Sequence, residues 1–204
     1  MNYDIVGIGN ALVDIQAQVD DALLETLQLT KGGMTLMAPE EQQQLLEQLK
    51  SYPLSISSGG SAANTIHGVG ALGGRAYYIG KVAHDEYGLH YSEDMKACEV
   101  GFPGTDSERS GTGTSVILIT PDAQRTMATH LGISITLHED NVDQTIIEGA
   151  RLVYIEGYLW TGDETRAAAR AAARIARDHG IPVAFTLSDA FVIHNHMEEL
   201  KEFI

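Results

Sequence analysis

The feature that most constrains this chain is a run of small residues, SSGGSAANT, at positions 57–65. The run contains Gly59, Gly60 and Asn64 and stands just before a helical pattern at residues 65–72. Glycines allow a backbone to approach a ligand closely, and the start of a helix offers unpaired N–H donors. An asparagine one turn in can present both a donor and an acceptor to a polyol. The run alone fits two interpretations: a cradle for a hydroxyl-rich small molecule, or a turn that merely starts a packed helix.

Composition and charge exclude several classes of protein. The 204 residues include 13 basic and 28 acidic side chains, and the formal net charge of -15 would repel a phosphate backbone, so we expect no nucleic-acid partner. No apolar run approaches the roughly 20 residues that cross a bilayer, so we expect no membrane partner. The single cysteine, Cys98, excludes an internal disulfide and fits a cytoplasmic location. The histidines show no spacing typical of a zinc site, so we expect no metal ion.

Strand and helix patterns alternate along most of the chain. Short apolar runs predict buried strands at residues 3–9, 76–82, 152–156 and 182–187. Helical patterns occupy residues 39–50, 65–72, 86–97, 142–149, 164–179 and 197–204. This alternation predicts an α/β fold in which a mostly parallel sheet is flanked by helices.

A second group of short strands suits a small separate sheet at one edge of the main one. Residues 12–19 and 33–37 have strand patterns, and so do residues 114–120 and 125–130. The sequence Pro-Asp-Ala-Gln between the last two has turn chemistry. These two runs therefore predict a β-hairpin.

Three sequence blocks occur together in this chain. They are GIGNALVD at residues 7–14, GGSAAN at 59–64 followed by IGKVAHDEYG at 79–88, and TGT at 112–114 leading on to Arg125. Jointly they resemble the ribokinase-like family of carbohydrate and nucleoside kinases, also called the PfkB family. Within that family the chain most resembles the adenosine-kinase-like members. The segments that carry this closer resemblance are residues 154–159 and 186–191.

The resemblance implies how residues 1–204 are organised. They would form part of one ribokinase-like domain, with segments of a small β-sheet lid at about residues 11–20, 33–38 and 104–131. The family's second signature, Asp-Thr-x-Gly-Ala-Gly-Asp, does not occur in the chain. In the family that signature supplies the catalytic aspartate and an anion hole. We therefore expect the C-terminal part of the fold to be missing, and we assign no catalytic residue.

The resemblance also implies a set of substrate-binding residues. Asp14 and Asn64 would bind ribose hydroxyls, and Arg125 would reach the substrate or a phosphate from the lid. Tyr158 and Phe191 stand where related kinases carry an aromatic side chain near the nucleobase, although ordinary core packing explains them equally well. The full set is Asn10, Asp14, Gly59, Gly60, Asn64, Arg125, Tyr158 and Phe191.

The activity that the resemblance implies is ATP-dependent phosphorylation of a nucleoside hydroxyl, as in adenosine kinases. ATP and Mg²⁺ would be the cofactors of the complete enzyme, with most of their binding region absent here, so we expect the chain alone to be inactive. A homodimer formed through the lid is a further expectation.

Three alternatives stay open at this point. The first is a sugar kinase of the ribokinase or fructokinase type, and the second is a non-catalytic nucleoside-binding module. The third, a dinucleotide-binding oxidoreductase, has only Gly7-x-Gly9 in its favour. It is disfavoured because Leu12 stands where the third glycine of that fingerprint belongs and because a strand pattern follows.

Overall fold

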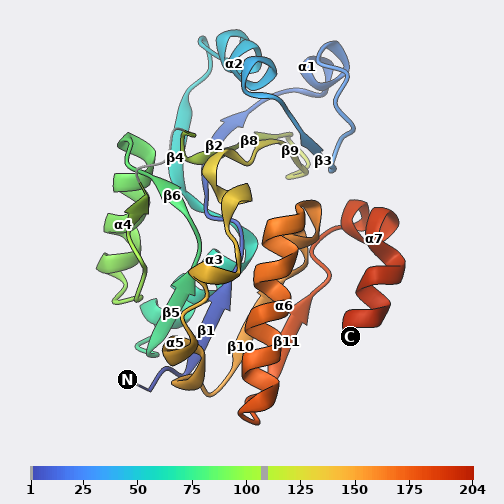
Figure 1. Cartoon of the computed structure of the whole chain (residues 1–204). Coiled ribbons are helices and arrows are strands. Elements are labelled where there is room, and N and C mark those ends of the chain that lie inside the picture. Colours follow the sequence, from blue (N-terminus) through green and yellow to red (C-terminus); the bar gives the residue numbers. More distant parts are fainter. Residues whose placement is uncertain (1, 107–109) are drawn as a thin grey trace.

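The computed structural model describes residues 2–106 and 110–204, and a parallel sheet forms the lower half of the molecule (Figure 1). Its strands lie in the order β11-β10-β1-β5, and each neighbouring pair is parallel. Their bounds are β1 (Ile5–Ile8), β5 (Ala76–Ile79), β10 (Val153–Glu156) and β11 (Val183–Thr186). The strands β1, β5 and β10 are rich in β-branched and aromatic residues, which suit a sheet that is buried on both faces.

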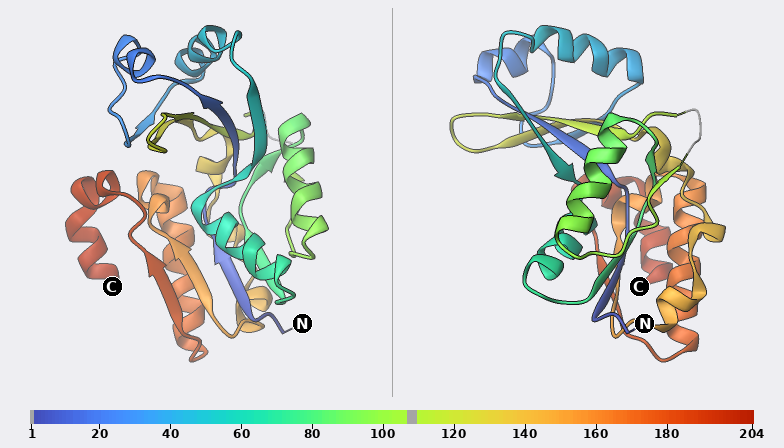
Figure 2. Two further views of the ribbon diagram at one scale, coloured as in Figure 1. Left: turned by 180° about the vertical axis from the view of Figure 1, so that it is seen from behind. Right: turned by 90° about the vertical axis from the view of Figure 1, so that its left-hand side faces the viewer.

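Helices cover both faces of this parallel sheet (Figure 2). One face carries α3 (Ser61–Ala71) and α4 (Glu86–Ala97), and the other carries α5 (Gln144–Glu148) and α6 (Asp163–Asp178). Neighbouring residues of β1 belong to different cores, since Ile5 is buried with Ile66 of α3 and Val6 with Ala168 of α6. The last helix, α7 (Ala190–Phe203), follows β11 and joins the same core as α6.

A mixed five-stranded sheet lies above the parallel sheet in Figure 1, in the order β3-β9-β8-β2-β4. Its strands are β2 (Leu12–Gln18), β3 (Met34–Leu36), β4 (Leu54–Gly59), β8 (Gly113–Ile119) and β9 (Arg125–His130). The helices α1 (Asp21–Thr26) and α2 (Pro39–Gln48) cover its outer face, where Ile15, Leu45 and Val116 share one core. Its inner face turns toward the carboxyl ends of the parallel strands.

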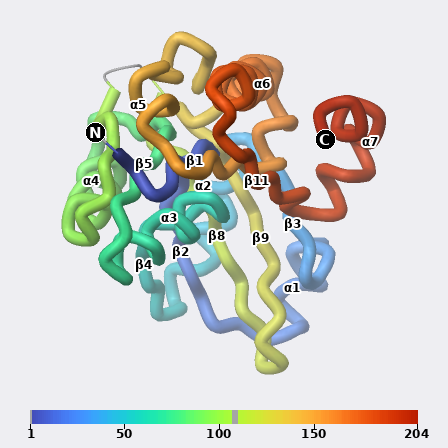
Figure 3. Tube along the Cα trace, turned by 90° about the horizontal axis from the view of Figure 1, so that it is seen from below, coloured from blue at the N-terminus to red at the C-terminus, as the bar shows by residue number. Residues whose placement is uncertain are grey.

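β8 and β9 form the predicted antiparallel hairpin and run side by side to its tip (Figure 3). A hydrogen bond from Thr120 N to Gln124 O (3.1 Å) closes the turn, in which Ala123 has a φ of 64°. Lys31 forms an ion pair with Asp122 at this tip (2.8 Å). The hairpin is therefore tied to the loop that follows α1.

The remaining described elements are short. β6 (Val82–Ala83) pairs with β7 (Thr105–Asp106). The 3-10 helices are η1 (Gly132–Thr136), η2 (Glu139–Asn141) and η3 (Gly157–Thr161). None of the helices within the described ranges combines the length and the apolar character that a bilayer crossing requires.

The predicted α/β fold, a mostly parallel sheet flanked by helices with a second small β-sheet, is confirmed. One helix starts earlier than its sequence pattern indicated, and another has an additional segment before the predicted one. α3 begins at Ser61 instead of residue 65, because Gly60 already occupies its N-cap position. α7 contains the predicted helical segment from residue 197, which follows a kink at the non-helical His196 (φ -129°, ψ 24°). An additional segment from Ala190 precedes the kink, because Asp189 accepts a hydrogen bond from Phe191 N (2.7 Å) and caps the helix there.

The small sheet contains one strand that the sequence pattern did not assign to it, β4, which pairs with β2 along its whole length. Of the predicted lid segments, 11–20 contains β2, 33–38 contains β3 and 104–131 contains β8 and β9. Thr105–Asp106 pair with β6 instead, and residues 107–109 of the last segment, like Met1, lie outside the described residues. The division of the chain into a domain and a lid stays a prediction.

Candidate substrate-binding site

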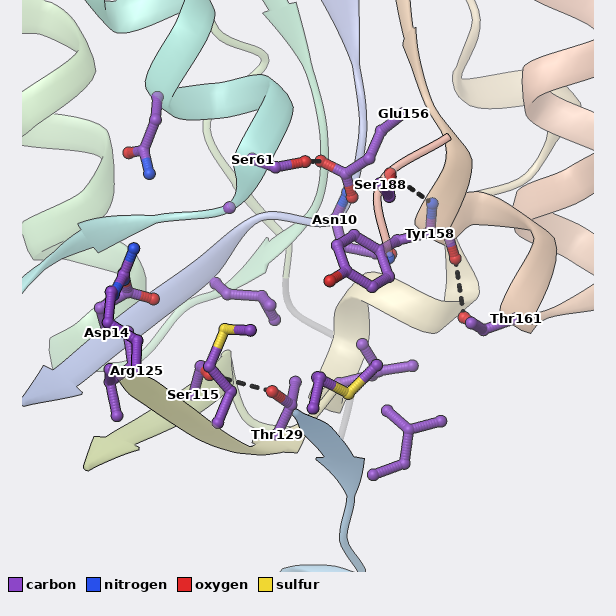
Figure 4. Close-up of a pocket in the computed structure, with 18 residues that line it drawn as sticks. Asn10, Asp14, Ser61, Ser115, Arg125, Thr129, Glu156, Tyr158, Thr161 and Ser188 are labelled. Atoms are coloured by element: carbon purple, nitrogen blue, oxygen red, sulfur yellow. Dashed lines mark hydrogen bonds and ion pairs between the residues drawn. The ribbon is translucent and has the colours of Figure 1, made fainter. Parts of the chain in front are cut away.

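A cavity of about 240 Å³ lies between the two sheets (Figure 4). Its walls come from residues after β1, β10 and β11, the first turn of α3 and the inner face of the five-stranded sheet. Pockets for drug-sized ligands measure roughly 300–1,000 Å³, so this cavity suits a small metabolite. The carboxyl ends of parallel strands are where open α/β sheets commonly bind ligands.

Gly60 lets the start of α3 approach the end of β1. Its φ is 98°, a conformation that side-chain-bearing residues rarely adopt. A Cβ at this position would lie only 2.4 Å from the carbonyl oxygen of Asn10. The position therefore requires glycine, and the close approach brings Asn10 and Asn64 into the wall of one cavity.

Glu156, the last residue of β10, holds three elements together at the cavity. It is 1% exposed, and its carboxylate accepts hydrogen bonds from Ala62 N (2.7 Å), Ser61 Oγ (2.8 Å) and Asn10 N (3.3 Å). Burial raises the pKa of Glu156, and the three donors oppose that rise because they favour the ionised form. Glu156 thereby fixes the first turn of α3 against the ends of β1 and β10.

Asp14 of β2 is a buried carboxyl group on the cavity wall, 7% exposed. Burial raises its pKa to about 6, and the nearby charge of Arg125 opposes this rise. The distance from Arg125 Nη2 to Asp14 Oδ2 is 3.7 Å, longer than a direct hydrogen bond. Gly59 lies beside Asp14, and a Cβ on Gly59 would lie 2.2 Å from Asp14 Oδ1. Glycine at residue 59 therefore makes room for the carboxyl group.

Asn10 lines the cavity and carries a buried acceptor that is unpaired within the described residues. The residue is 2% exposed, and its Oδ1 has no hydrogen-bond partner among the described residues. Most buried polar side-chain atoms in proteins are hydrogen-bonded, so an orphaned oxygen on a cavity wall calls for an explanation. A donor on a bound ligand would supply the missing hydrogen bond.

The opposite end of the cavity is formed by Tyr158, Thr161 and Ser188 (Figure 4). Ser188 Oγ accepts a hydrogen bond from Tyr158 N (3.2 Å), and Thr161 Oγ1 donates one to Tyr158 O (2.8 Å). Burial raises the pKa of Tyr158, so its hydroxyl stays protonated at neutral pH. Ser188 has a φ of 65°, an uncommon conformation for a residue other than glycine.

The inner face of the five-stranded sheet is mostly apolar where it lines the cavity. Its apolar side chains come from β2, β3, β8, β9 and the residue after β9: Leu12, Met34, Leu36, Ile117, Met127 and Leu131. The buried hydroxyl groups of Ser115 and Thr129 interrupt this apolar surface, and their oxygens lie 2.9 Å apart. The cavity thus joins a polar wall at the glycines to an apolar wall on the small sheet.

Most of the residues proposed from the sequence meet at this cavity. Those that line it are Asn10, Asp14, Gly60, Asn64, Arg125 and Tyr158. Gly59 contributes through Asp14, without being part of the lining itself. Phe191 lies on the first turn of α7, is 36% exposed and is not part of the lining.

Sequence reasoning did not single out Glu156, Ser115 or Thr129. A charged residue that ends a buried strand, as Glu156 does, was an available signal. The alternation of Ser115 and Ile117 with the buried Val116 was another, because it indicates a strand with two different faces. Which residues of β3, β8 and β9 stand next to one another depends on strand pairing, which the sequence pattern does not specify.

The parallel sheet, the helix whose N-cap is Gly60 and the small sheet above them define an α/β protein with a cavity of mixed polar and apolar lining between its two sheets. The chain belongs to the pfkB family of carbohydrate kinases, which it matches over residues 34–204.

Comparisons with individual proteins agree with this family. Guanosine-inosine kinase of Escherichia coli (strain K12) is 26% identical over 212 residues, which cover 98% of this chain but 48% of that relative. The structure of adenosine kinase from Sinorhizobium meliloti has a TM-score of 0.94 and 40% identity, covering 99% of this chain and 62% of that one. A probable sugar kinase from Rhizobium etli CFN 42 has a TM-score of 0.94 and 36% identity, covering 98% of this chain and 60% of that one. The chain therefore spans about half the length of the curated relative and less than two thirds of the two solved structures.

Proposed function

We propose that this chain binds a nucleoside as the acceptor substrate of an ATP-dependent kinase. The ribose would lie at the polar wall and the base against the apolar wall. The observation that carries the proposal is the buried Asp14 carboxyl on the cavity wall, whose ion-pair partner Arg125 stands 3.7 Å away. A carboxylate in that position can accept hydrogen bonds from the neighbouring hydroxyls of a ribose, and such charge-assisted bonds are among the stronger ones in proteins.

The other polar groups on the same wall complement a sugar. The orphaned Asn10 Oδ1 accepts a hydroxyl hydrogen, and the Asn64 amide can both donate and accept. Glu156 contributes by fixing the turn that carries Asn64, since its oxygens are bonded to Ser61 and Ala62. The wall is therefore rich in acceptors, which suits a ligand rich in hydroxyl donors.

The apolar wall supports a nucleoside over a free sugar. Leu36, Met127 and Leu131 present hydrocarbon surface to the cavity, and Tyr158 adds an aromatic ring. A nucleobase can pack its faces against such a surface, and base–aromatic stacking contributes about 1–3 kcal/mol. A monosaccharide has hydroxyls on both faces and would leave them unpaired there. The sugar-kinase alternative stays relevant because a probable sugar kinase is 36% identical to this chain.

Membership of a kinase family implies ATP, and Mg²⁺ is typical of such enzymes. Within residues 2–106 and 110–204, no group of three or more His, Cys, Asp or Glu side chains is placed to hold a metal ion. Mg²⁺ in kinases is usually held by one or two carboxylates together with substrate phosphates, so this finding does not test such a site, and we derive no step through ATP or Mg²⁺. The proposed role of this chain is to bind the nucleoside, orient its hydroxyl and exclude water, and we expect no phosphoryl transfer by residues 1–204 alone.

Isothermal titration calorimetry tests the proposed binding. The 204-residue chain should bind adenosine or inosine at one site and D-ribose at least tenfold more weakly. Asn64→Ala should weaken nucleoside binding by about tenfold, the loss expected for one or two hydrogen bonds. Asn2→Ala, at an exposed position outside the cavity, should bind like the unchanged chain.

The same titrations can contradict the proposal. Tight binding of ribose or fructose without nucleoside binding would favour the sugar kinase. No binding of any of these ligands, with the fold intact by circular dichroism, would reject both alternatives.

We also propose a homodimer formed through the lid. β4 is an edge strand of the small sheet, and Leu54 and Ile56 on it are 43% and 49% exposed. Exposed edge strands readily pair with another chain. Residues 54–59 carry no charge, so this edge avoids the repulsion expected between two copies of net charge -15. Sedimentation velocity should show a dimer that Ile56→Lys dissociates. An unchanged chain that is monomeric at about 100 μM, where even a dimer held by only about 5.5 kcal/mol would form, would contradict the proposal.

A further inference from the structure

One row of side chains crosses the inner face of the small sheet. The strand register places Asp14 of β2 beside Ser115 of β8, Ser115 beside Thr129 of β9, and Thr129 beside Leu36 of β3. All four residues line the cavity, and Figure 4 shows the hydroxyl pair facing it between Asp14 and the Tyr158 end. The row therefore changes from charged to hydroxyl to apolar across the cavity.

The two hydroxyls carry one more hydrogen than they use. Ser115 and Thr129 are 3% and 5% exposed, and their oxygens lie 2.9 Å apart. One hydroxyl donates to the other, and each hydroxyl has a single hydrogen. The hydrogen of the accepting hydroxyl has no acceptor among the described residues. The pair thus leaves one unused donor, buried and facing a cavity, where an unpaired polar group is costly.

The position of this donor limits the ligand that can use it. Neighbouring strands lie about 4.8 Å apart, so Ser115 and Thr129 stand about 5 Å and 10 Å from Asp14 along the row. A free pentose bound to Asp14 would extend about as far as Ser115 and would not reach Thr129. A nucleoside continues past its ribose by the length of a ring system, so its base reaches the hydroxyl pair.

We propose that the Ser115–Thr129 pair determines specificity by donating a hydrogen bond to a ring nitrogen of a purine base. The inference rests on the proposed nucleoside site and adds the group that distinguishes a nucleoside from a sugar. In adenosine the ring nitrogens N1, N3 and N7 each carry an in-plane lone pair and no hydrogen, so each can accept a hydrogen bond from the unused O–H. The adjacent Leu36, Ile117 and Met127 pack against the base and offer it no competing acceptor.

Analogues that lack one ring nitrogen at a time provide the test. Adenosine, 1-deazaadenosine, 3-deazaadenosine and 7-deazaadenosine are titrated calorimetrically into the unchanged chain, into the double variant Ser115→Ala/Thr129→Val and into Thr129→Ser. The unchanged chain should bind at least one deaza analogue about tenfold more weakly than adenosine. The double variant should bind adenosine about tenfold more weakly and should no longer distinguish that analogue. Thr129→Ser keeps the hydroxyl and should retain the discrimination.

Each other outcome overturns the proposal. Equal binding of all four nucleosides by the unchanged chain would mean that none of the three ring nitrogens accepts a hydrogen bond that contributes to binding. A double variant that keeps the discrimination, or a Thr129→Ser chain that loses it, would assign the effect to packing. Failure of the unchanged chain to bind any nucleoside would reject the proposed function as well, whereas the preceding outcomes leave nucleoside binding intact. Thermal melting of each variant verifies that it is folded.

Discussion

Glu156→Ala should lower the free energy of unfolding by about 3 kcal/mol at pH 7 in urea denaturation. The substitution leaves Ala62 N, Ser61 Oγ and Asn10 N without their acceptor. Each buried donor without a partner costs about 1–3 kcal/mol. The variant no longer buries a carboxylate, and this gain offsets part of the total cost of the three unpaired donors. The effect is large because a single side chain satisfies donors from β1's end and from α3.

Two further variants make this prediction specific. Glu156→Gln keeps one acceptor oxygen and should cost less than alanine. Glu25→Ala, an exposed position on α1, should change the unfolding free energy by less than about 0.5 kcal/mol. If Glu156→Ala were as stable as Glu25→Ala, the three hydrogen bonds would not hold the cavity wall together.

Asp14→Asn should weaken nucleoside binding at least tenfold while making the free protein more stable at pH 8. The pKa of Asp14 in the folded chain is about 6, above its ordinary value of 3.8, because the carboxyl is buried. The folded protein therefore binds more protons than the unfolded one between those values, and Asp14 lowers stability as the pH rises through 6. The shift corresponds to about 3 kcal/mol at pH 8, which the asparagine variant regains in part.

The pH dependence separates this effect from a general change in packing. The stability difference between Asp14→Asn and the unchanged chain should shrink below pH 6 and vanish near pH 4, in thermal or urea unfolding. Nucleoside affinity of the unchanged chain should fall over the same range, as the carboxylate becomes protonated. Asp178→Asn, at an exposed position, is the matched control. A stability difference that is constant from pH 4 to 8 would show that Asp14 does not titrate in this window.

The sequence predicted the parts of this fold that depend on local patterns. The alternation of apolar runs and helical segments is enough to indicate the parallel sheet and its covering helices, and the turn after residue 120 is enough to indicate the β8–β9 hairpin. The resemblance to the PfkB family implied that Asn10, Asp14, Gly60 and Asn64 share one site, and in the structure all four line the same cavity.

What the sequence could not predict depends on contacts between distant segments. β4 mixes Leu54 and Ile56 with three serines and a glycine, and its place in the small sheet follows from pairing with β2. Glu156 meets its donors on α3 only because β10 lies next to β1. Ser115 and Thr129 stand 14 positions apart, and their contact depends on the register of the hairpin.

The two sheets are connected through the residues that line the cavity. Asn10 lies between the end of β1 and the start of β2, and Gly60 lies between the end of β4 and the start of α3. We therefore expect any tilt of the small sheet to turn the backbone that carries both residues. Such a tilt would change the hydrogen-bonding geometry of the cavity at the same time, and a ligand bound to Asn10 would restrain it.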